Sequence, residues 1–268
     1  MDLCVCKNNH TPMQDLTHGC CTLSHIPLRA SGSHRSEMVS QLLFGESYRV
    51  LAATEEWLEV ETDFDHYRGF LAANQHYGLS EADCPIRQDI PLTCALEPLR
   101  LRCENNGLRL TVPPSAALPL DKENRIRIGK LVFTLESDLR PLRLPDILAN
   151  YTNAPYLWGG RTPWGMDCSG FTQAVYKTQG IALPRDASMQ ALLGKEIPLA
   201  QARFGDLAFF RNENGRITHT GWMLSPDRIL HCSGRVREDR IDEKGIVRIP
   251  DDVRTHTLHC IKHIADLS

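Results

Sequence analysis

Residues 167–171 read Asp-Cys-Ser-Gly-Phe and begin a segment in which apolar side chains recur at helical spacing, which predicts a helix over residues 169–179. The preceding residues 150–165 are rich in Gly, Pro and aromatic side chains, and this composition indicates a loop. Cys168 therefore lies at a predicted helix start. There the unpaired backbone N–H groups and the helix dipole favour a thiolate and can bind an oxyanion. Cys168 is a candidate nucleophile.

Two histidines downstream lie in short apolar segments bounded by turn residues: His219 in residues 217–224 and His231 in residues 228–234. We expect these segments to form antiparallel strands joined by a tight turn. The even spacing of the two histidines places them on one face of such a hairpin. A helix cysteine beside two sheet histidines supplies the nucleophile, base and orienting group of a thiol hydrolase or acyltransferase.

Each of these residues alone is more often part of a core, and only the ordered set favours catalysis. Cys232 illustrates the structural alternative. It follows His231 directly, so strand alternation turns its side chain to the opposite face of the sheet. We expect Cys232 to be structural.

Several motifs follow one another in a recognisable order. Tyr-Leu-Trp-Gly-Gly (156–160) precedes Asp-Cys-Ser-Gly-Phe, and Leu-Pro-Arg-Asp (183–186), Gly-Asp-Leu-Ala-Phe-Phe (205–210) and the two histidine strands come after it. This order resembles the NlpC/p60 family of bacterial cell-wall cysteine peptidases, over residues 139–268. The resemblance implies a papain-like α+β domain in which the Cys168 thiolate attacks an amide beside D-glutamate of a peptidoglycan stem peptide. It also implies that His219 is the base and His231 orients it.

The chain before this domain is predicted to be β-rich. Residues 20–78 contain short alternating segments at 23–29, 47–53, 57–62 and 67–71, typical of a small β-barrel, and the segment resembles bacterial SH3 modules. Residues 79–138 are interpreted as a second, divergent SH3-like module, or alternatively as an insertion packed on the catalytic domain. Residues 1–19 form an N-terminal extension. The predicted fold is α+β, with two SH3-like barrels before the peptidase.

This combination most resembles γ-D-glutamyl-L-diamino acid endopeptidases of the dipeptidyl-peptidase VI type. The resemblance implies a murein peptide as substrate, with a free N-terminal L-Ala, and release of L-Ala-γ-D-Glu. A buried substrate ammonium needs compensating carboxylates, because an unpaired buried charge is costly. Glu37 of the first module and Asp167 are the candidates. Glu46, in a loop before a strand, is interpreted as a solvated charge.

The same matching implies further substrate contacts. Tyr67 would contribute to a wall at one end of the groove, Ser169 would contact the D-glutamate, and Asp186 and Ala187 would form a substrate-contacting pair. Asp186 is equally interpretable as a helix cap. The family often has a hydroxyl where this chain has Ala187, so the contact there would fall to its backbone N–H or to Ser188.

Tyr156 is the last candidate. Its phenol could donate to the oxyanion of the tetrahedral intermediate together with the Cys168 backbone N–H. A tyrosine that only packs in a Gly-rich loop is the alternative.

Composition excludes several classes. A net charge of −3 offers no electrostatic case for nucleic acid, and no apolar run is long enough to span a bilayer. The N-terminus lacks the basic start and apolar core of a signal peptide, so the expected location is cytoplasmic, or the periplasm or cell envelope if a leader has been removed. Ten cysteines in 268 residues do not indicate a disulfide scaffold.

No metal or organic cofactor is predicted. Cys4, Cys6, Cys20 and Cys21, with two nearby histidines, lack the repeated spacing of a zinc knuckle. In addition, two adjacent cysteines in a strand point to opposite faces.

Two rival functions remain from the sequence. A thiol amidase or acyltransferase on another small amide would need Cys168 and His219 but not Glu37. A non-catalytic wall-binding protein would need none of them. The sequence does not distinguish lysine from diaminopimelate as the leaving residue, and the oligomeric state is also open.

Overall fold

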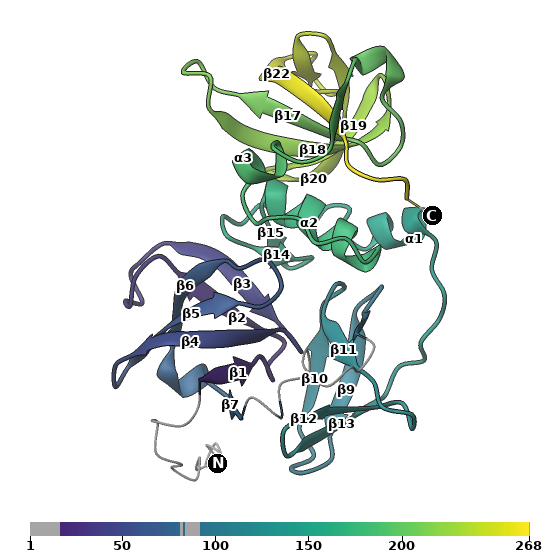
Figure 1. The fold of residues 1–268 in the computed structure, drawn as a ribbon. Helices are drawn as coiled ribbons and strands as arrows, with labels where there is room; N and C mark the ends of the chain where they lie inside the picture. Colours follow the sequence, from purple (N-terminus) through teal and green to yellow (C-terminus); the bar gives the residue numbers. More distant parts are fainter. Residues whose placement is uncertain (1–16, 81–82, 84–91, 268) are drawn as a thin grey trace.

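The computed structural model describes residues 17–80, 83 and 92–267, which form two β modules and a larger α+β unit (Figure 1). Most of the predicted N-terminal extension, with Cys4 and Cys6, lies outside the described residues. Within the described residues, no helix has the length and apolar composition needed to cross a membrane. The seven cysteines among them are all free thiols.

The first module is an antiparallel sheet in the order β3-β2-β6-β5-β4-β1-β7. Its strands are β1 (His18–Cys20), β2 (His25–Arg29), β3 (Met38–Leu43), β4 (Ser47–Ala53), β5 (Trp57–Thr62), β6 (Arg68–Ala72) and β7 (Gly78–Leu79), with the short 3-10 helix η1 (Ala73–Gln75) before β7. Burial alternates along β2, where Ile26 and Leu28 enter the core and their neighbours do not. The four strands predicted in this region are confirmed to within two residues.

The second module comprises a four-stranded sheet, β10-β9-β13-β12, and the strand pair β11-β8. The strands are β8 (Leu92–Cys94), β9 (Leu99–Cys103), β10 (Arg109–Val112), β11 (Ala117–Pro119), β12 (Arg125–Ile128) and β13 (Leu131–Leu135). Strands β12 and β13 form a hairpin. Its turn contains Gly129, whose φ of 55° lies in the left-handed region that glycine adopts without strain.

The first module contributes side chains to the hydrophobic core of the second. Cys20, Phe44 and Leu79 of the first module pack among the buried residues of the second, and the Phe44 and Phe133 rings meet edge to face with centroids 5.1 Å apart. Cys21, next to Cys20, instead enters the core of the first module. The opposite facing of these two cysteines, expected from alternation, is confirmed. The second module therefore packs mainly on the first module.

The C-terminal unit contains helices α1 (Leu144–Ala149), α2 (Cys168–Thr178) and α3 (Ala187–Gln190), the 3-10 helix η4 (Leu199–Gln201) and the short hairpin β14 (Arg161–Thr162) and β15 (Gly165–Met166). Its sheet is formed by β16 (Lys195–Ile197), β17 (Leu207–Arg211), β18 (Ile217–Ser225), β19 (Arg228–Ser233), β20 (Arg235–Asp242), β21 (Gly245–Val247) and β22 (Arg254–His263). The predicted helix and the predicted histidine strands appear as α2, β18 and β19. In α1, Asp146 lies inside the first turn, and the N-cap is Arg143.

The sheet closes on itself. β21 pairs with β22, so the strands β22-β17-β18-β19-β20-β21 form an all-antiparallel barrel with β16 attached to β22. Every barrel strand turns one of its faces inward. Side chains on these inner faces, such as Phe210, Met223 and Ile229, fill the barrel interior. The alternate face, including Trp222 and Leu230, packs against α1 and α2. This second face positions the start of α2 against β18.

A buried ion cluster connects the first module to the C-terminal unit. Both Glu46 carboxylate oxygens accept hydrogen bonds from the Arg161 guanidinium at 2.9 Å, and Lys177 of α2 also donates to Glu46. All three side chains are at most 7% exposed. The interpretation of Glu46 as a solvated charge was wrong, because the C-terminal unit covers the loop of the first module in which Glu46 lies. Burial alone would raise the pKa of Glu46. The positive charges of Arg161 and Lys177, with their hydrogen bonds, outweigh burial and lower this pKa to about 2.

Candidate active site

Cys168 is the first residue of α2. The helix begins there because the Asp167 side chain caps it, accepting the Gly170 N–H at 2.8 Å. Gly170 has a steric role as well, since a Cβ at this position would lie 2.2 Å from the Gly160 carbonyl oxygen. The Cys168 side chain is 6% exposed, and its sulfur accepts hydrogen bonds from the backbone N–H groups of Thr220 and Ser169.

The thiol of Cys168 is less acidic than expected. Burial, with a smaller contribution from Asp167, raises its pKa to about 12, whereas the two N–H groups and Arg185 act in the opposite direction. The expectation of a depressed pKa from the helix start alone was wrong for the substrate-free protein, because burial and the capping carboxylate outweigh the helix terminus. The resting nucleophile is therefore a thiol and requires a base.

His219, on β18, precedes Thr220, whose N–H contacts the Cys168 sulfur. Its Nε2 lies 2.8 Å from Nδ1 of His231 on β19, and Nε2 of His231 lies 2.9 Å from Oδ2 of Asp239 on β20. Strand alternation had predicted that the two histidines share a face, and their contact confirms it. All three side chains are at least 95% buried.

This chain of contacts determines the tautomers. Burial would raise the pKa of Asp239, but hydrogen bonds from His231, the Ile249 N–H and Arg237 hold it well below its usual range, so Asp239 is a carboxylate that can only accept. His231 must then carry its proton on Nε2 and accept at Nδ1 from the His219 Nε2–H. The lone pair of His219 is left on Nδ1, as a general base requires.

Both histidines are neutral at neutral pH. Burial lowers the pKa of His219 well below its usual value, and His256 and His231 lower it further. The ring of His256, on β22, stacks on that of His219 with centroids 4.1 Å apart. A neutral base beside a neutral thiol means that charge separates only when the proton moves.

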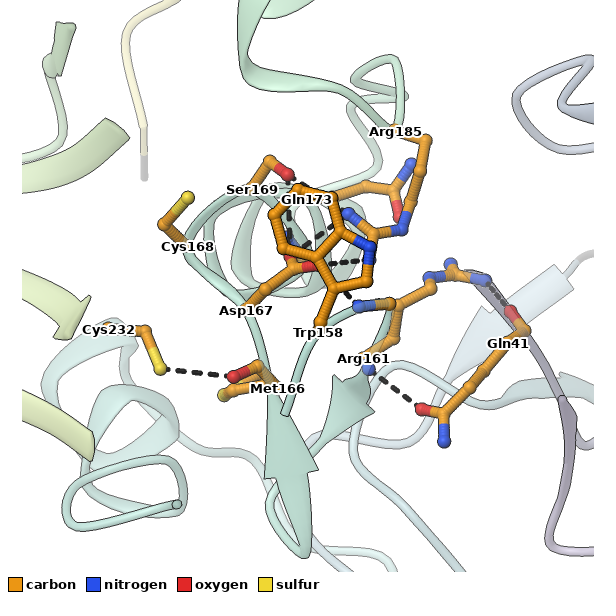
Figure 2. Close-up of polar contacts among 12 residues, drawn as sticks. Gln41, Trp158, Arg161, Met166, Asp167, Cys168, Ser169, Gln173, Arg185 and Cys232 are labelled. Carbon is orange, nitrogen blue, oxygen red and sulfur yellow. Dashed lines mark hydrogen bonds and ion pairs between the residues drawn. The ribbon is translucent and has the colours of Figure 1, made fainter. Parts of the chain in front are cut away.

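Cys232 faces away from this relay. Its thiol donates to the Met166 carbonyl oxygen at 3.1 Å, and the side chain lies in the core under α2 (Figure 2). The expected structural place of Cys232, on the face opposite His231, is confirmed.

Asp167 has no free acceptor for a substrate amine. Arg185 forms a bidentate pair with it at 3.0 and 2.6 Å, and the N–H groups of Gly159 and Gly170 donate to it at 2.8 Å (Figure 2). Arg185 also donates to Ser169 Oγ at 2.9 Å. The pairing of Asp167 with Glu37 around an ammonium is therefore not supported, because Asp167 is neutralised by an arginine from the Leu-Pro-Arg-Asp motif.

Asp186 is the carboxylate that meets the first module. It occupies the N-cap position of α3 but makes no side-chain cap bond, and the Tyr67 hydroxyl lies close enough to act on its pKa, in the lowering direction. Burial raises the pKa of Asp186, and Arg185 opposes this. The pKa of Tyr67 is raised to about 12, by burial first and then by Asp186. Ala187 is buried at the start of α3.

Glu37 and Tyr156 lie at the rim. Glu37 is exposed and accepts a hydrogen bond from the Trp158 indole N–H, so the first module reaches the Gly-rich loop here. At Gly159, whose φ is 78°, a Cβ would lie 2.3 Å from the Met38 carbonyl oxygen. Tyr156 is 39% exposed, and its pKa is raised to about 12 by burial and then by Cys168 and Asp167.

The sequence reasoning missed Asp239, Arg185 and His256. Asp239 had a detectable signal, since it alternates in phase with the interior residue Ile241 of β20 and an inward acid in a strand is unusual. Arg185 lies inside a motif that was noticed only for Asp186. Nothing in the local sequence indicates that His256 stacks on His219, because β22 lies beside β17 in the sheet although the two strands are far apart in the sequence.

Comparisons with known proteins agree with this geometry. The NlpC/P60 family model matches residues 153–249, and the model of the bacterial dipeptidyl-peptidase Sh3 domain matches residues 28–75. The chain is 33% identical over 218 residues to the gamma-D-glutamyl-L-lysine dipeptidyl-peptidase of Bacillus subtilis (strain 168), covering 72% of this chain and 71% of that protein. It is 24% identical over 228 residues to the Bacillus cereus (strain ATCC 10987) protein of that name, covering 74% and 68%.

Among solved structures, an NlpC/P60 family protein from Bacillus cereus ATCC 10987 superposes with a TM-score of 0.75 at 17% identity, covering 92% of this chain and 99% of that one. That likeness concerns the fold. The sequence similarity to the Bacillus subtilis enzyme extends beyond the C-terminal unit, since it covers 72% of this chain. The chain therefore belongs to the NlpC/P60 family of cysteine peptidases.

Proposed function

We propose that this peptidase hydrolyses the γ-D-glutamyl-L-diamino acid bond of murein peptides that carry a free N-terminal L-Ala, and releases L-Ala-γ-D-Glu. The observation that carries the proposal is the Tyr67 to Asp186 contact, which brings the first module against the nucleophile's own domain. The relatives named gamma-D-glutamyl-L-lysine dipeptidyl-peptidase support the bond type.

The chemistry begins with a neutral pair. His219 Nδ1 takes the Cys168 proton as the sulfur attacks the γ-glutamyl carbonyl carbon, and His231 with Asp239 stabilises the imidazolium that forms. The Cys168 backbone N–H and the Tyr156 hydroxyl would donate to the oxyanion. His219 then protonates the leaving amine, and water, deprotonated by His219, releases the acid from the thioester.

The arrangement of α2 against the antiparallel sheet supports a papain-like domain: the nucleophile begins a helix, and the base lies on an adjacent strand. In papain-like enzymes the third residue orients the base, and here that place falls to His231, itself held by Asp239.

Free-amine recognition is assigned to Asp186, with Glu37 at the rim and Tyr67 as the wall. Asp186 is exposed, so an incoming ammonium can reach it and would favour the ionised form of a carboxyl whose pKa is raised, first of all by desolvation. Ser169 is held by Arg185 and faces the same side of the helix start, where it could contact the D-glutamate. The buried Ala187 side chain leaves only its backbone N–H for the substrate.

The test compares L-Ala-γ-D-Glu-L-Lys, its diaminopimelate counterpart and the N-acetylated forms of both. We expect cleavage of the free-amine peptides only, with the Asp186→Asn variant raising KM for them far more than it changes kcat. Equal cleavage of free and acetylated peptides would remove the amine-recognition proposal. Cleavage of none would favour a thiol amidase or acyltransferase on another amide, or a non-catalytic wall-binding protein.

A further inference from the structure

Three histidines meet on the inner face of the barrel. His219, His231 and His256 come from β18, β19 and β22, and one ring nitrogen of each lies within 4.8 Å of the other two. The relay to Cys168 uses the first two. His256 has no place in that relay, although its ring lies within 6 Å of both others, centroid to centroid.

The protons on these rings leave suitable lone pairs. His256 can donate its Nδ1–H to Thr255 Oγ1, 2.8 Å away, and Nε2 then carries the lone pair. Nδ1 of His231 carries a lone pair, because the proton of this neutral ring is on Nε2, which donates to Asp239. A ligating histidine whose other nitrogen donates to a carboxylate is the usual outer-shell arrangement of protein zinc sites.

The charges beside the three histidines are nearly balanced. Arg237 is the nearby positive group, but it is paired with Asp239 at 2.8 Å and donates also to the Ser233 carbonyl. The two charges cancel. Burial lowers the pKa of each histidine, to about 4 for His256, so all three are unprotonated and able to coordinate at neutral pH.

We propose that His219, His231 and His256 form an inhibitory site for a divalent transition-metal cation such as Zn²⁺. Imidazole is a preferred ligand of Zn²⁺, and three histidines with one open position are a complete protein set. Zn–N bonds of about 2.0–2.1 Å place nitrogens roughly 3.4 Å apart. The 2.8 Å between His219 and His231 and the 4.8 Å limit of the set bracket this separation, so small ring movements suffice.

Inhibition follows from the tautomer of His219. The cation takes the Nε2 lone pair, so the proton that Nε2 held moves to Nδ1, with no net proton released. Nδ1 then carries a hydrogen and cannot accept the Cys168 proton. The binding is independent of the proposed function, whereas the inhibition rests on it.

Binding is tested with Co²⁺ as a spectroscopic probe in the inactive Cys168→Ala variant. We expect visible d–d absorption of a tetrahedral site that saturates at one Co²⁺ per chain, because no ligand is the thiol. Adding His256→Phe, which keeps a stacked ring, should abolish the absorption. His259→Phe is the matched control, since His259 is exposed on the same strand, and it should leave the spectrum unchanged. Absence of absorption in Cys168→Ala, or its persistence after His256→Phe, would overturn the site.

Inhibition is tested with Zn²⁺ in enzyme that retains Cys168. We expect His256→Phe to weaken inhibition at least about tenfold, since even outer-shell partners of a metal are worth about 10–100-fold in affinity. His256→Gln provides a second variant should the first misfold. Equal inhibition of wild type and both variants would place the ion on Cys168 and His219 and sink the proposal. Three-histidine Co²⁺ binding by a protein that cleaves no murein peptide would instead refute the function alone.

Discussion

The ion cluster between the first module and the C-terminal unit predicts that Glu46→Gln is strongly destabilising. The substitution leaves Arg161 and Lys177, which are 2% and 7% exposed, without a counter-charge. A folded-state pKa of about 2 against 4.5 corresponds to about 3 kcal/mol at 1.36 kcal/mol per unit. Breaking a buried ion pair from one side costs about 3–5 kcal/mol in general. We therefore expect a loss of about 3 kcal/mol in the free energy of unfolding.

Urea unfolding followed by tryptophan fluorescence measures this loss. Glu61→Gln is the matched control, because Glu61 pairs only with exposed arginines of its own module, and it should leave the midpoint almost unchanged. The reasoning also predicts that the Glu46 contribution is present above pH 4.5 and is lost as the pH falls toward about 2, since the carboxylate is the stabilised form. A loss below about 1 kcal/mol at neutral pH would refute the reasoning, because a cost that small is typical of surface pairs.

Two further outcomes follow from the relay, and a third from His219 together with its neighbour His256. Cys168→Ser should keep the fold and lose turnover, measured as dipeptide release; retained turnover would reject the nucleophile. Asp239→Asn should lower kcat by roughly 10²–10⁴-fold, as tautomer errors do in related triads, with KM little changed and Asp242→Asn on the same strand as the control; an unaffected kcat would remove Asp239 from the relay. The lowered pKa values of His219 and His256 mean that stability is fully present above pH 6.5 and falls as the pH drops, by at most about 1.4 kcal/mol per unit for each histidine. A stability that stays flat from pH 6.5 to 4.5 in urea melts would contradict this.

Local patterns identified the elements that carry the chemistry. Helical periodicity after Cys168 and strand alternation around His219 and His231 each depend only on neighbouring residues, and the resulting helix and hairpin are present as α2, β18 and β19. The same alternation correctly assigned Cys232 to the opposite face. The roles of these residues in catalysis stay predictions until variants are measured.

Charges were harder to predict, because their partners are distant in sequence. Glu46 lies 115 residues from Arg161, and nothing in its own loop indicates that another unit covers it. Asp167 seemed free because Arg185, 18 residues later, was not considered as its partner. The acidity of Cys168 was misjudged for a related reason, since burial depends on everything that packs around the helix start.

The packing of the first module into the core of the second bears on how this protein can change over evolution. Phe44 belongs to one module and is buried among residues of the other, and its backbone carbonyl also accepts a hydrogen bond from the Ala117 N–H. A module that contributes side chains to its neighbour's interior cannot be exchanged, duplicated or deleted by itself. We therefore expect the two modules to be retained together, with substitutions in the second tolerated only where they preserve the surface that receives Phe44.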